Sequence, residues 1–190
     1  MLDYKAISID IETLGTRPGC TILSIGACEF TDKGVGTQFY DGITVESCSQ
    51  WGLTIEPRTV LWWLEQKDDA RQFITQGKRS DLDVVLTNLR SAFKWKGKQV
   101  WCNGASFDFP ILTAAYDAVG KNPPWEYWAQ MDYRTLKNIV PRDVFDKFKV
   151  EPVVKHNALA DAVAQAETTI ELLRYLHGGK NGDKNIKRAA

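Results

Sequence analysis

Residues 6–15, AISIDIETLG, contain the strand that decides the fold of this chain. Isoleucine alternates with polar or acidic side chains along it: Ile7, Ile9 and Ile11 alternate with Ser8, Asp10 and Glu12. Strict alternation of this kind predicts a β-strand with one apolar face. The opposite face carries two carboxylates, which lie roughly 7 Å apart when they are two residues apart on a strand. A pair of acids on a solvated edge is the simplest explanation, but so apolar a strand belongs in the middle of a sheet.

Outside this strand, the sequence predicts further strands and then alternating helices and strands. Strands are expected at residues 4–12, 21–31, 37–45, 99–103 and 127–131. Helices are expected at residues 56–66, 80–95, 108–119, 133–140 and 157–176. Ser80 and Asn157 are the expected N-caps, and Gly178–Gly179 is expected to end the last helix. This order predicts an α/β fold with a mixed central sheet of about five strands flanked by helices.

Composition excludes several classes of protein. The 24 lysines and arginines balance the 24 aspartates and glutamates, so no broad basic surface is available to hold long nucleic acid. No signal peptide or membrane span is predicted, and the four cysteines lack the spacing of a zinc site. Reduced, buried thiols are expected, together with a cytoplasmic location. The length suits a single domain over residues 1–178, followed by a polar, flexible tail over residues 179–190.

Two later motifs also carry groups suited to chemistry. Asp108, in NGASFDF, follows a short strand at the start of a predicted helix, where an aspartate is also favoured as a cap. His156 and Asp161, in HNALAD, are five residues apart, so on one helix they would point about 140° away from each other. They converge only if His156 lies in the loop before the helix. Taken alone, His156 also fits a surface loop.

Together, the acids at positions 10, 12, 108 and 161 favour a metal site. Four carboxylates brought close together raise one another's pKa unless cations lie between them. Oxygen ligands suit Mg²⁺ or Mn²⁺, and two such ions about 4 Å apart can clamp the attacking and leaving oxygens of a phosphodiester. A histidine beside them can deprotonate the attacking water near neutral pH.

In order and spacing, the motifs DIET, SFD and HNALAD resemble those of the DEDDh 3′–5′ exonucleases of the ribonuclease H-like superfamily. The resemblance covers about residues 4–176. The stretches RTVLWWLEQ, GASFDFPIL and WAQMDYRT resemble the branch with the T-even phage exonuclease and a mycobacterial exoribonuclease, which points to a phage or prophage protein.

This resemblance implies a ribonuclease H-like fold and a role for each of the five residues. Asp10 is expected to bridge two Mg²⁺ or Mn²⁺ ions, Glu12 and Asp161 to complete one metal site, and Asp108 to serve the other. His156 is the expected general base, and the expected product is a nucleoside 5′-monophosphate.

The resemblance also implies a pocket for the terminal nucleotide. Thr13 and Leu14 are expected to border it and Phe107 to stack on a base, although core packing explains Leu14 and Phe107 equally well. One of Trp62 and Trp63 is expected in the core and the other in the cleft, and Trp63 is taken as the substrate contact.

Other charged residues near the motifs have simpler explanations as well. Asp132 and Arg134 fit a helix cap with a salt bridge, and Arg134 alternatively fits phosphate binding. Lys94, Lys96 and Lys98 fit a solvated turn, and His177 fits the end of the last helix.

The predicted function is metal-dependent 3′–5′ exonuclease activity on single-stranded 3′ ends, with DNA preferred and an exoribonuclease as the alternative. An endonuclease of the same superfamily would not normally carry the His-x4-Asp pair of HNALAD. A catalytically silent nucleic-acid-binding protein would be free to lose these acids and the histidine. A homodimer is compatible with exposed tryptophans.

Overall fold

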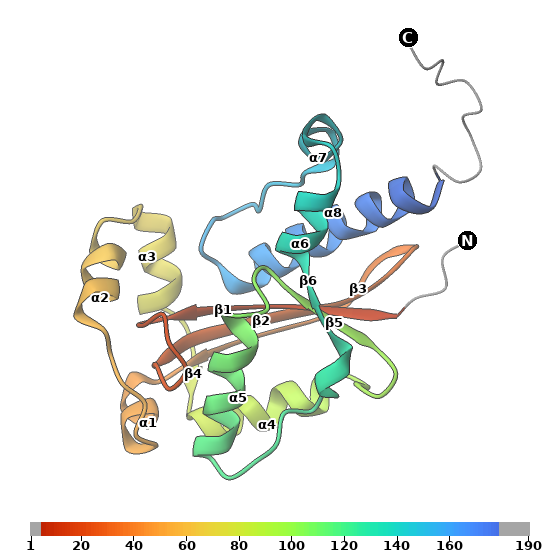
Figure 1. Ribbon diagram of the computed structural model, residues 1–190. Helices are drawn as coiled ribbons and strands as arrows, with labels where there is room; N and C mark the ends of the chain where they lie inside the picture. Colours follow the sequence, from red (N-terminus) through yellow and green to blue (C-terminus); the bar gives the residue numbers. More distant parts are fainter. Residues whose placement is uncertain (1–4, 179–190) are drawn as a thin grey trace.

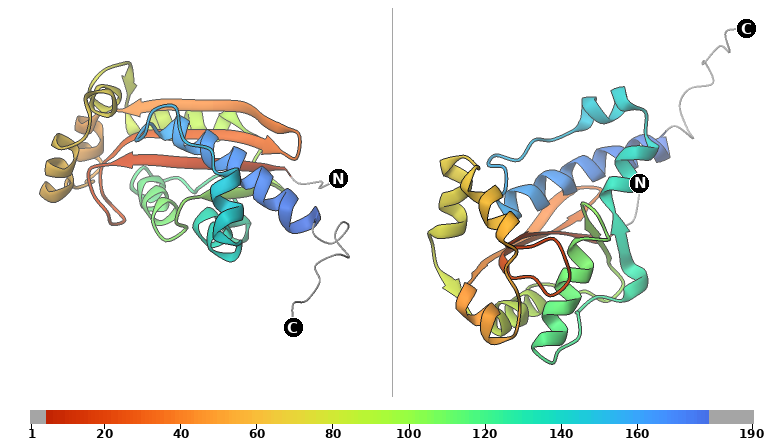
Figure 2. Two further views of the ribbon diagram at one scale, coloured as in Figure 1. Left: turned by 90° about the horizontal axis from the view of Figure 1, so that it is seen from above. Right: turned by 60° about the vertical axis from the view of Figure 1, so that its left-hand side comes forward.

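The computed structural model describes residues 5–178, without the side chains of residues 73 and 74. Within this part of the chain the core is a six-stranded mixed sheet with helices on both faces (Figures 1 and 2). Across the sheet the strands are β4 (Arg79–Ser80), β3 (Gly34–Ile43), β2 (Ile22–Thr31), β1 (Ala6–Thr13), β5 (Gln99–Cys102) and β6 (Gln130–Asp132). The first three strands in sequence pair antiparallel, whereas β5 is parallel to β1 and to β6. The predicted mixed sheet is confirmed, with one short strand more than expected.

The helices form three groups around this sheet (Figure 1). One face is covered by α4 (Leu82–Ala92) and α5 (Asp108–Ala118), and the other by α6 (Tyr133–Ile139), α7 (Arg142–Phe148) and α8 (Ala158–Gly178). Beyond one end of the strands lie α1 (Val45–Gln50), α2 (Pro57–Leu64) and α3 (Asp68–Thr75). A short 3₁₀ helix, η1 (Tyr127–Ala129), precedes β6. None of the helices between residues 5 and 178 combines the length and apolar character needed to cross a bilayer.

The two faces of β1 pack against different layers. Its isoleucines are at most 5% exposed and belong to the main hydrophobic cluster, together with the apolar faces of α4 and α5. On the other face, Ala6 packs in a second cluster with residues of α6, α7 and α8. The alternation in the sequence therefore gives one face to the core and the other to the side covered by α8.

A glycine sets how closely α8 approaches the sheet. Gly26 of β2 pairs directly with Asp10 of β1. A Cβ atom at Gly26 would lie 2.1 Å from the Leu159 nitrogen and 2.2 Å from the Ala158 carbonyl carbon. Distances this short are not tolerated, so the first turn of α8 can occupy its place only because residue 26 has no side chain. This contact brings the start of α8 directly over the strand beside Asp10.

Several predicted boundaries are wrong. Ser80 does not cap α4, because it lies in β4 and pairs with Ile43; Asp81 is the N-cap, and the Leu82 amide donates to the Ser47 hydroxyl at 3.0 Å. Strand β3 begins at Gly34 and ends at Ile43, so it lies earlier than the expected 37–45. The helices α1, α3 and α7 were not predicted.

The last helix begins as predicted. The Asn157 side chain accepts a hydrogen bond from the Ala160 amide at 2.9 Å. Gly179, one half of the expected stop, and the predicted tail over residues 179–190 lie outside the described residues.

Candidate active site

Three of the four predicted acids come together where β1 meets α8. Asp10 and Glu12 lie on the α8 side of β1, and Asp161 is in the first turn of α8. One carboxylate oxygen from each of the three lies within 4.8 Å of the others. We call Asp10, Glu12, Asp108 and Asp161 the acid group, because Asp108 lies against these three.

Asp108 reaches the acid group from α5. It is the first residue of the helix rather than its cap, and it is 3% exposed. Its carboxylate accepts hydrogen bonds from its own amide, from the Cys102 thiol and from the Ile11 amide. Pairing between β1 and β5 ends at Ser8, which leaves the Ile11 amide available. Asp108 is thereby held beside β1, close enough for its charge to act on Asp10 and Glu12.

Burial and mutual repulsion disfavour the charged form of these acids. Burial, followed by the charges of Asp161 and Asp108, raises the pKa of Glu12 to about 8. Burial raises the pKa of Asp108 to about 7, against its hydrogen bonds. The pKa of Asp10 is raised well above its ordinary value by burial and by the other three carboxylates. Burial also raises the pKa of Asp161, while the charge of His156 opposes the shift.

Gln165 is a residue of the site that the sequence motifs did not reveal. It lies one turn after Asp161 on α8, and its side-chain amide donates to Asp10 Oδ1 at 2.9 Å. The side chain is 8% exposed, and Gln165 Oε1 has no hydrogen-bond partner among the described residues. The i, i+4 spacing from Asp161 is a signal that could have placed it on the same helix face.

His156 lies in the loop before α8, as predicted. Its backbone has φ of 61°, the left-handed region that few residues other than glycine adopt without cost. The imidazole packs edge-on against Trp62, with ring centroids 5.0 Å apart, and against Trp63 at 6.0 Å. Because the Asn157 cap directly follows it, His156 stays next to the first turn of α8 and to Asp161.

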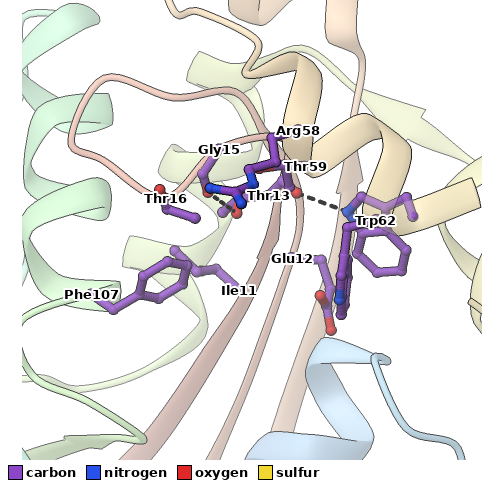
Figure 3. Close-up of a pocket in the computed structure, with 10 residues that line it drawn as sticks. Ile11, Glu12, Thr13, Gly15, Thr16, Arg58, Thr59, Trp62 and Phe107 are labelled. Atoms are coloured by element: carbon purple, nitrogen blue, oxygen red, sulfur yellow. Dashed lines mark hydrogen bonds between the residues drawn. The ribbon is translucent and has the colours of Figure 1, made fainter. Parts of the chain in front are cut away.

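An aromatic cavity of about 390 Å³ adjoins the acid group at the end of β1 (Figure 3). Glu12, Thr13, Trp62, Trp63 and Phe107 are among its lining residues. Phe107 and Trp62 lie on opposite sides of the cavity in Figure 3, and the Glu12 carboxylate points toward the start of α8. The cavity has the size and aromatic walls suited to a flat ring, with one carboxylate of the acid group at its edge.

Trp62 and Trp63 differ in burial and in their contacts. Trp63 is 4% exposed, and its indole Nε1 donates to the Thr13 carbonyl at 2.9 Å, so it ties α2 to the end of β1. Trp62 is 41% exposed. Leu14 is not among the residues that line the cavity; it packs against the small cluster that contains Trp63.

Arg134 lies outside the aromatic cavity but near Asp108. Its guanidinium donates to the Asn103 carbonyl at 2.8 Å, and its charge lowers the pKa of Asp108 against the effect of burial. Asp132 is the N-cap of α6 and accepts from the Arg134 amide at 3.0 Å. Among residues 5–178, no ion pair joins the side chains of Asp132 and Arg134.

The other charged candidates lie away from the acid group. Lys94 and Lys96 are exposed between α4 and β5, and Lys98 pairs with Glu29. His177 is in the last turn of α8.

The acid group suits a hard divalent cation. It offers carboxylate oxygens and no soft ligand in position, since the thiol of Cys102 is fully buried and donates to Asp108. A bound cation would also favour the charged form of all four carboxylates, against the burial that raises their pKa values and the repulsion that adds to it at Asp10 and Glu12. The residues present therefore fit Mg²⁺ or Mn²⁺.

Comparisons with known proteins agree with this geometry. The family profile of the 3′–5′ exoribonuclease Rv2179c-like domain matches residues 5–173. The exodeoxyribonuclease of Enterobacteria phage T4 is 26% identical over 204 residues, which cover 90% of this chain and 89% of that protein.

Solved structures share the fold at low sequence identity. Exonuclease I superposes with a TM-score of 0.66 at 16% identity over 91% of this chain, which spans 41% of exonuclease I. Pop2p of S. pombe, in its Mg²⁺- and Mn²⁺-bound form, gives 0.63 at 15% identity and covers 94% of this chain and 86% of its own. Exonuclease X with 5′-overhanging duplex DNA gives 0.59 at 15% identity, with 90% and 92% covered. The chain therefore belongs to the Rv2179c-like 3′–5′ exoribonuclease domain family, within the DEDDh exonucleases of ribonuclease H-like fold, and it is a 3′–5′ exonuclease.

Proposed function

We propose that the protein removes nucleotides from the 3′ end of single-stranded DNA, releasing nucleoside 5′-monophosphates with the help of two Mg²⁺ or Mn²⁺ ions. The observation that carries this proposal is the convergence of Asp10, Glu12 and Asp161 within 4.8 Å beside an aromatic cavity. Cleavage at a strand end needs both parts, because the cavity holds the last nucleotide and the acid group meets the phosphodiester that links it to the strand.

The four carboxylates of the acid group would hold the ions. When bound, the ions supply charge that stabilises the attacking and leaving oxygens of an in-line displacement. The protein prepares this arrangement by fixing two of the carboxylates: Gln165 orients Asp10, and the Ile11 amide and Cys102 thiol orient Asp108. Side chains held in this way need no rearrangement when substrate arrives.

His156 is the proposed general base. One of its ring nitrogens accepts a proton from the attacking water, and the imidazole later returns it to solvent. Edge-on packing against Trp62 and Trp63 holds the ring in place. Asp161 lies close enough to His156 for their charges to interact.

The aromatic cavity is the proposed site of the terminal nucleotide. Phe107 and the exposed face of Trp62 can sandwich its base, and stacking of this kind tolerates any base. Trp63 and Leu14, which were predicted as direct contacts, would act mainly by supporting the wall that Thr13 forms. A single splayed strand enters such a cavity more readily than a duplex end.

DNA is the proposed substrate because two of the three threonine hydroxyls that line the cavity already donate hydrogen bonds within the protein. The Thr13 hydroxyl donates to the Gly15 carbonyl at 2.6 Å, and the Thr16 hydroxyl donates to Glu56 at 3.1 Å. Both threonines are therefore already engaged within the protein, and the 2′-hydroxyl is what distinguishes RNA from DNA. The exodeoxyribonuclease of phage T4 as a relative supports this choice. RNA is the second candidate, because the matched family is described as an exoribonuclease family.

One gel tests the substrate and the direction of cleavage. Single-stranded DNA and RNA of one sequence, labelled at the 5′ end, are incubated with Mg²⁺, with Mn²⁺ and with chelator. We expect a ladder that shortens from the 3′ end with either metal, faster on DNA, and no cleavage with chelator. Asp10→Asn is the control for contaminating nucleases. Cleavage of a closed circular strand, or an RNA ladder that outruns the DNA ladder, would contradict the proposal.

Three further proposals concern the setting of the reaction. Tyr127 and Trp128 are 79% and 65% exposed, which supports a homodimer that light scattering can test. The four buried, unpaired cysteines support a cytoplasmic location. The phage relative supports a phage or prophage origin.

A further inference from the structure

A second cavity, of about 200 Å³, borders the acid group on the side of α6, α7 and α8. Asp161, His156 and Gln165 contribute to its wall, so it adjoins the same reacting centre as the aromatic cavity. Three lysines also line it: Lys137 from α6, Lys149 just after α7 and Lys155 from the loop before α8. No predicted role of the sequence motifs involves these lysines.

The two cavities differ in chemistry. The aromatic cavity has about twice the volume and is lined by Trp62, Trp63 and Phe107, which suits a base. The second cavity, which we call the lysine cavity, also has two aromatic residues in its wall, Tyr133 and Phe145, but it adds three ammonium groups that the aromatic cavity lacks. Ammonium groups bind phosphate as point charges with up to three hydrogen bonds each. The lysine cavity therefore suits a backbone phosphate.

The balance of charge in the lysine cavity leaves Lys137 available. Glu151 contacts Lys149 and lies 3.9 Å from Lys155, so it partly neutralises both. Lys137 is half-buried and forms no ion pair within residues 5–178. A half-buried lysine without a carboxylate partner keeps its ammonium group free to bind an anion in the cavity.

Two buried acceptors in the same wall also lack donors. Asn103 Oδ1 and Gln165 Oε1 are inaccessible to solvent and have no hydrogen-bond partner among the described residues. Buried acceptors of this kind are uncommon in folded proteins. A phosphate oxygen is itself an acceptor and cannot pair with them directly, so only a water molecule that donates both to the phosphate and to one of these amide oxygens would satisfy them.

We propose that the lysine cavity binds the phosphate on the 5′ side of the penultimate nucleotide, with Lys137 as its principal contact. This inference rests on the proposed function, because it places the substrate strand across the acid group from the aromatic cavity. The terminal nucleotide occupies the aromatic cavity, the scissile phosphate lies at the acid group, and the next phosphate lies at Lys137. The lysine cavity thus positions the strand through its backbone and does not depend on its sequence.

Two substrates separate this subsite from the chemistry. Single-stranded DNA presents the upstream phosphate, whereas the p-nitrophenyl ester of thymidine 5′-monophosphate presents one nucleotide and a scissile bond but no upstream phosphate. We expect Lys137→Ala to lower kcat/KM on single-stranded DNA by about tenfold, the usual effect of losing one charge-assisted hydrogen bond. The same variant should hydrolyse the ester at the wild-type rate. The slope of log kcat/KM against log salt on DNA should fall in magnitude by about 0.7.

Two other variants complete the design. Lys96→Ala removes an exposed lysine from the connection between α4 and β5, at the other end of β5 from Asn103, and should leave both substrates unaffected. Glu151→Gln releases Lys149 and Lys155 from their carboxylate partner and should increase kcat/KM on DNA about two- to threefold, as expected for a weak exposed ion pair.

The outcomes are distinct. Unchanged kcat/KM on DNA for Lys137→Ala, or an equal loss on DNA and on the ester, would overturn the subsite. If the wild-type protein cleaves neither substrate, the proposed function fails. In that case, anisotropy of 5′-labelled single-stranded DNA with Ca²⁺ still tests the subsite, because Lys137→Ala must weaken binding more than Lys96→Ala does.

Discussion

Both faces of β1 are covered, although Asp10 on the acidic face is only half-buried, and the two faces serve different purposes. Ile9 on one face is 0% exposed and Ser8 on the other is 1% exposed. The isoleucine face packs against large side chains of α4 and α5, whereas the acidic face lies beneath α8, whose inward residues near the site are mainly alanines. Apolar burial on the first face stabilises the fold. On the second face, small residues let strand and helix approach, and the acids that meet there oppose stability.

The comparison predicts that changes on the acidic side reduce catalysis far more than stability, with His156 as the strongest case. Replacing it by asparagine removes the imidazole but keeps a residue that tolerates its φ of 61°. We expect kcat on single-stranded DNA to fall by about 10²-fold or more, the usual contribution of a positioned acid–base group. The Tm in thermal unfolding should stay close to that of the wild type.

His177→Asn is the matched control, because His177 is the other histidine of the chain. It lies in the last turn of α8, away from the acid group, and its replacement should leave kcat unchanged. Near-normal turnover by His156→Asn would show that another group takes the proton.

A change on the isoleucine face should instead reduce stability far more than catalysis. Ile9→Ala removes a fully buried side chain from the main cluster and should lower the free energy of unfolding by about 2–5 kcal/mol. Urea unfolding measures this, and the folded fraction should retain most of its activity. Ser8→Ala, the control on the other face, removes a hydroxyl without a partner among the described residues and should change stability by less than about 1 kcal/mol. Equal losses in the two variants would contradict the distinction between the faces.

Gly26→Ala should lower both stability and catalysis, because it moves α8, which carries Asp161, away from the sheet that carries Asp10 and Glu12. The added Cβ would lie 2.1 Å from the Leu159 nitrogen, so the first turn of α8 must shift together with Asp161. We expect a loss of about 1–3 kcal/mol in stability and of about tenfold or more in kcat/KM, since small misplacements of reacting groups are costly.

Gly36→Ala is the control for the glycine substitution itself. Gly36 lies in β3, and its nearest neighbours would be 3.9 Å from an added Cβ, which is ordinary contact. If Gly26→Ala keeps full activity, the close approach of α8 is not needed for the site.

The smallest expected effect is a dependence of stability on pH in metal-free protein. The pKa of Glu12 rises from 4.5 to about 8 on folding, and that of Asp108 from 3.8 to about 7. The folded protein therefore binds more protons than the unfolded chain between about pH 4 and pH 8, and its stability falls as pH rises through this range. With chelator, we expect the Tm to be lower at pH 8 than at pH 5.5 by at least the roughly 2–4 °C that 1 kcal/mol produces.

Glu12→Gln supplies the reference for this measurement. It removes one carboxyl with a raised pKa and should flatten the dependence, as should excess Mg²⁺ added to the wild-type protein. Parallel Tm curves for the wild type and the variant would show that the acid group does not titrate in this way.

Local pattern was enough to predict one half of the site. Alternation in β1 predicted both the buried isoleucines and the acidic face, and the order of a strand, a turn and a helix predicted where Asp108 would lie. The position of His156 before the Asn157 cap also followed from sequence, because capping depends on neighbouring residues.

The other half depends on contacts between distant segments. The sequence gives no reason to single out Gly26, because its importance comes from the contact with α8. The role of Gln165 likewise depends on its hydrogen bond to Asp10, which is far away in the sequence. Helical periodicity predicted that Trp62 and Trp63 point in different directions but not which one is buried. Trp63 is the buried one, and its indole donates a hydrogen bond to the Thr13 carbonyl, a contact between distant segments. The helix α1, with six residues, is too short for periodicity to reveal.

The distance in sequence between Asp10 and Asp161 has a consequence during protein synthesis. Among the described elements, β1 leaves the ribosome first and α8 last. Until α8 emerges and packs over Gly26, the nascent chain carries Asp10, Glu12 and Asp108 but has no Asp161 beside them. On the proposed mechanism, a chain that terminates before this helix is expected to have no nuclease activity, so nucleic acids around the ribosome would meet an active enzyme only after the sheet has been covered.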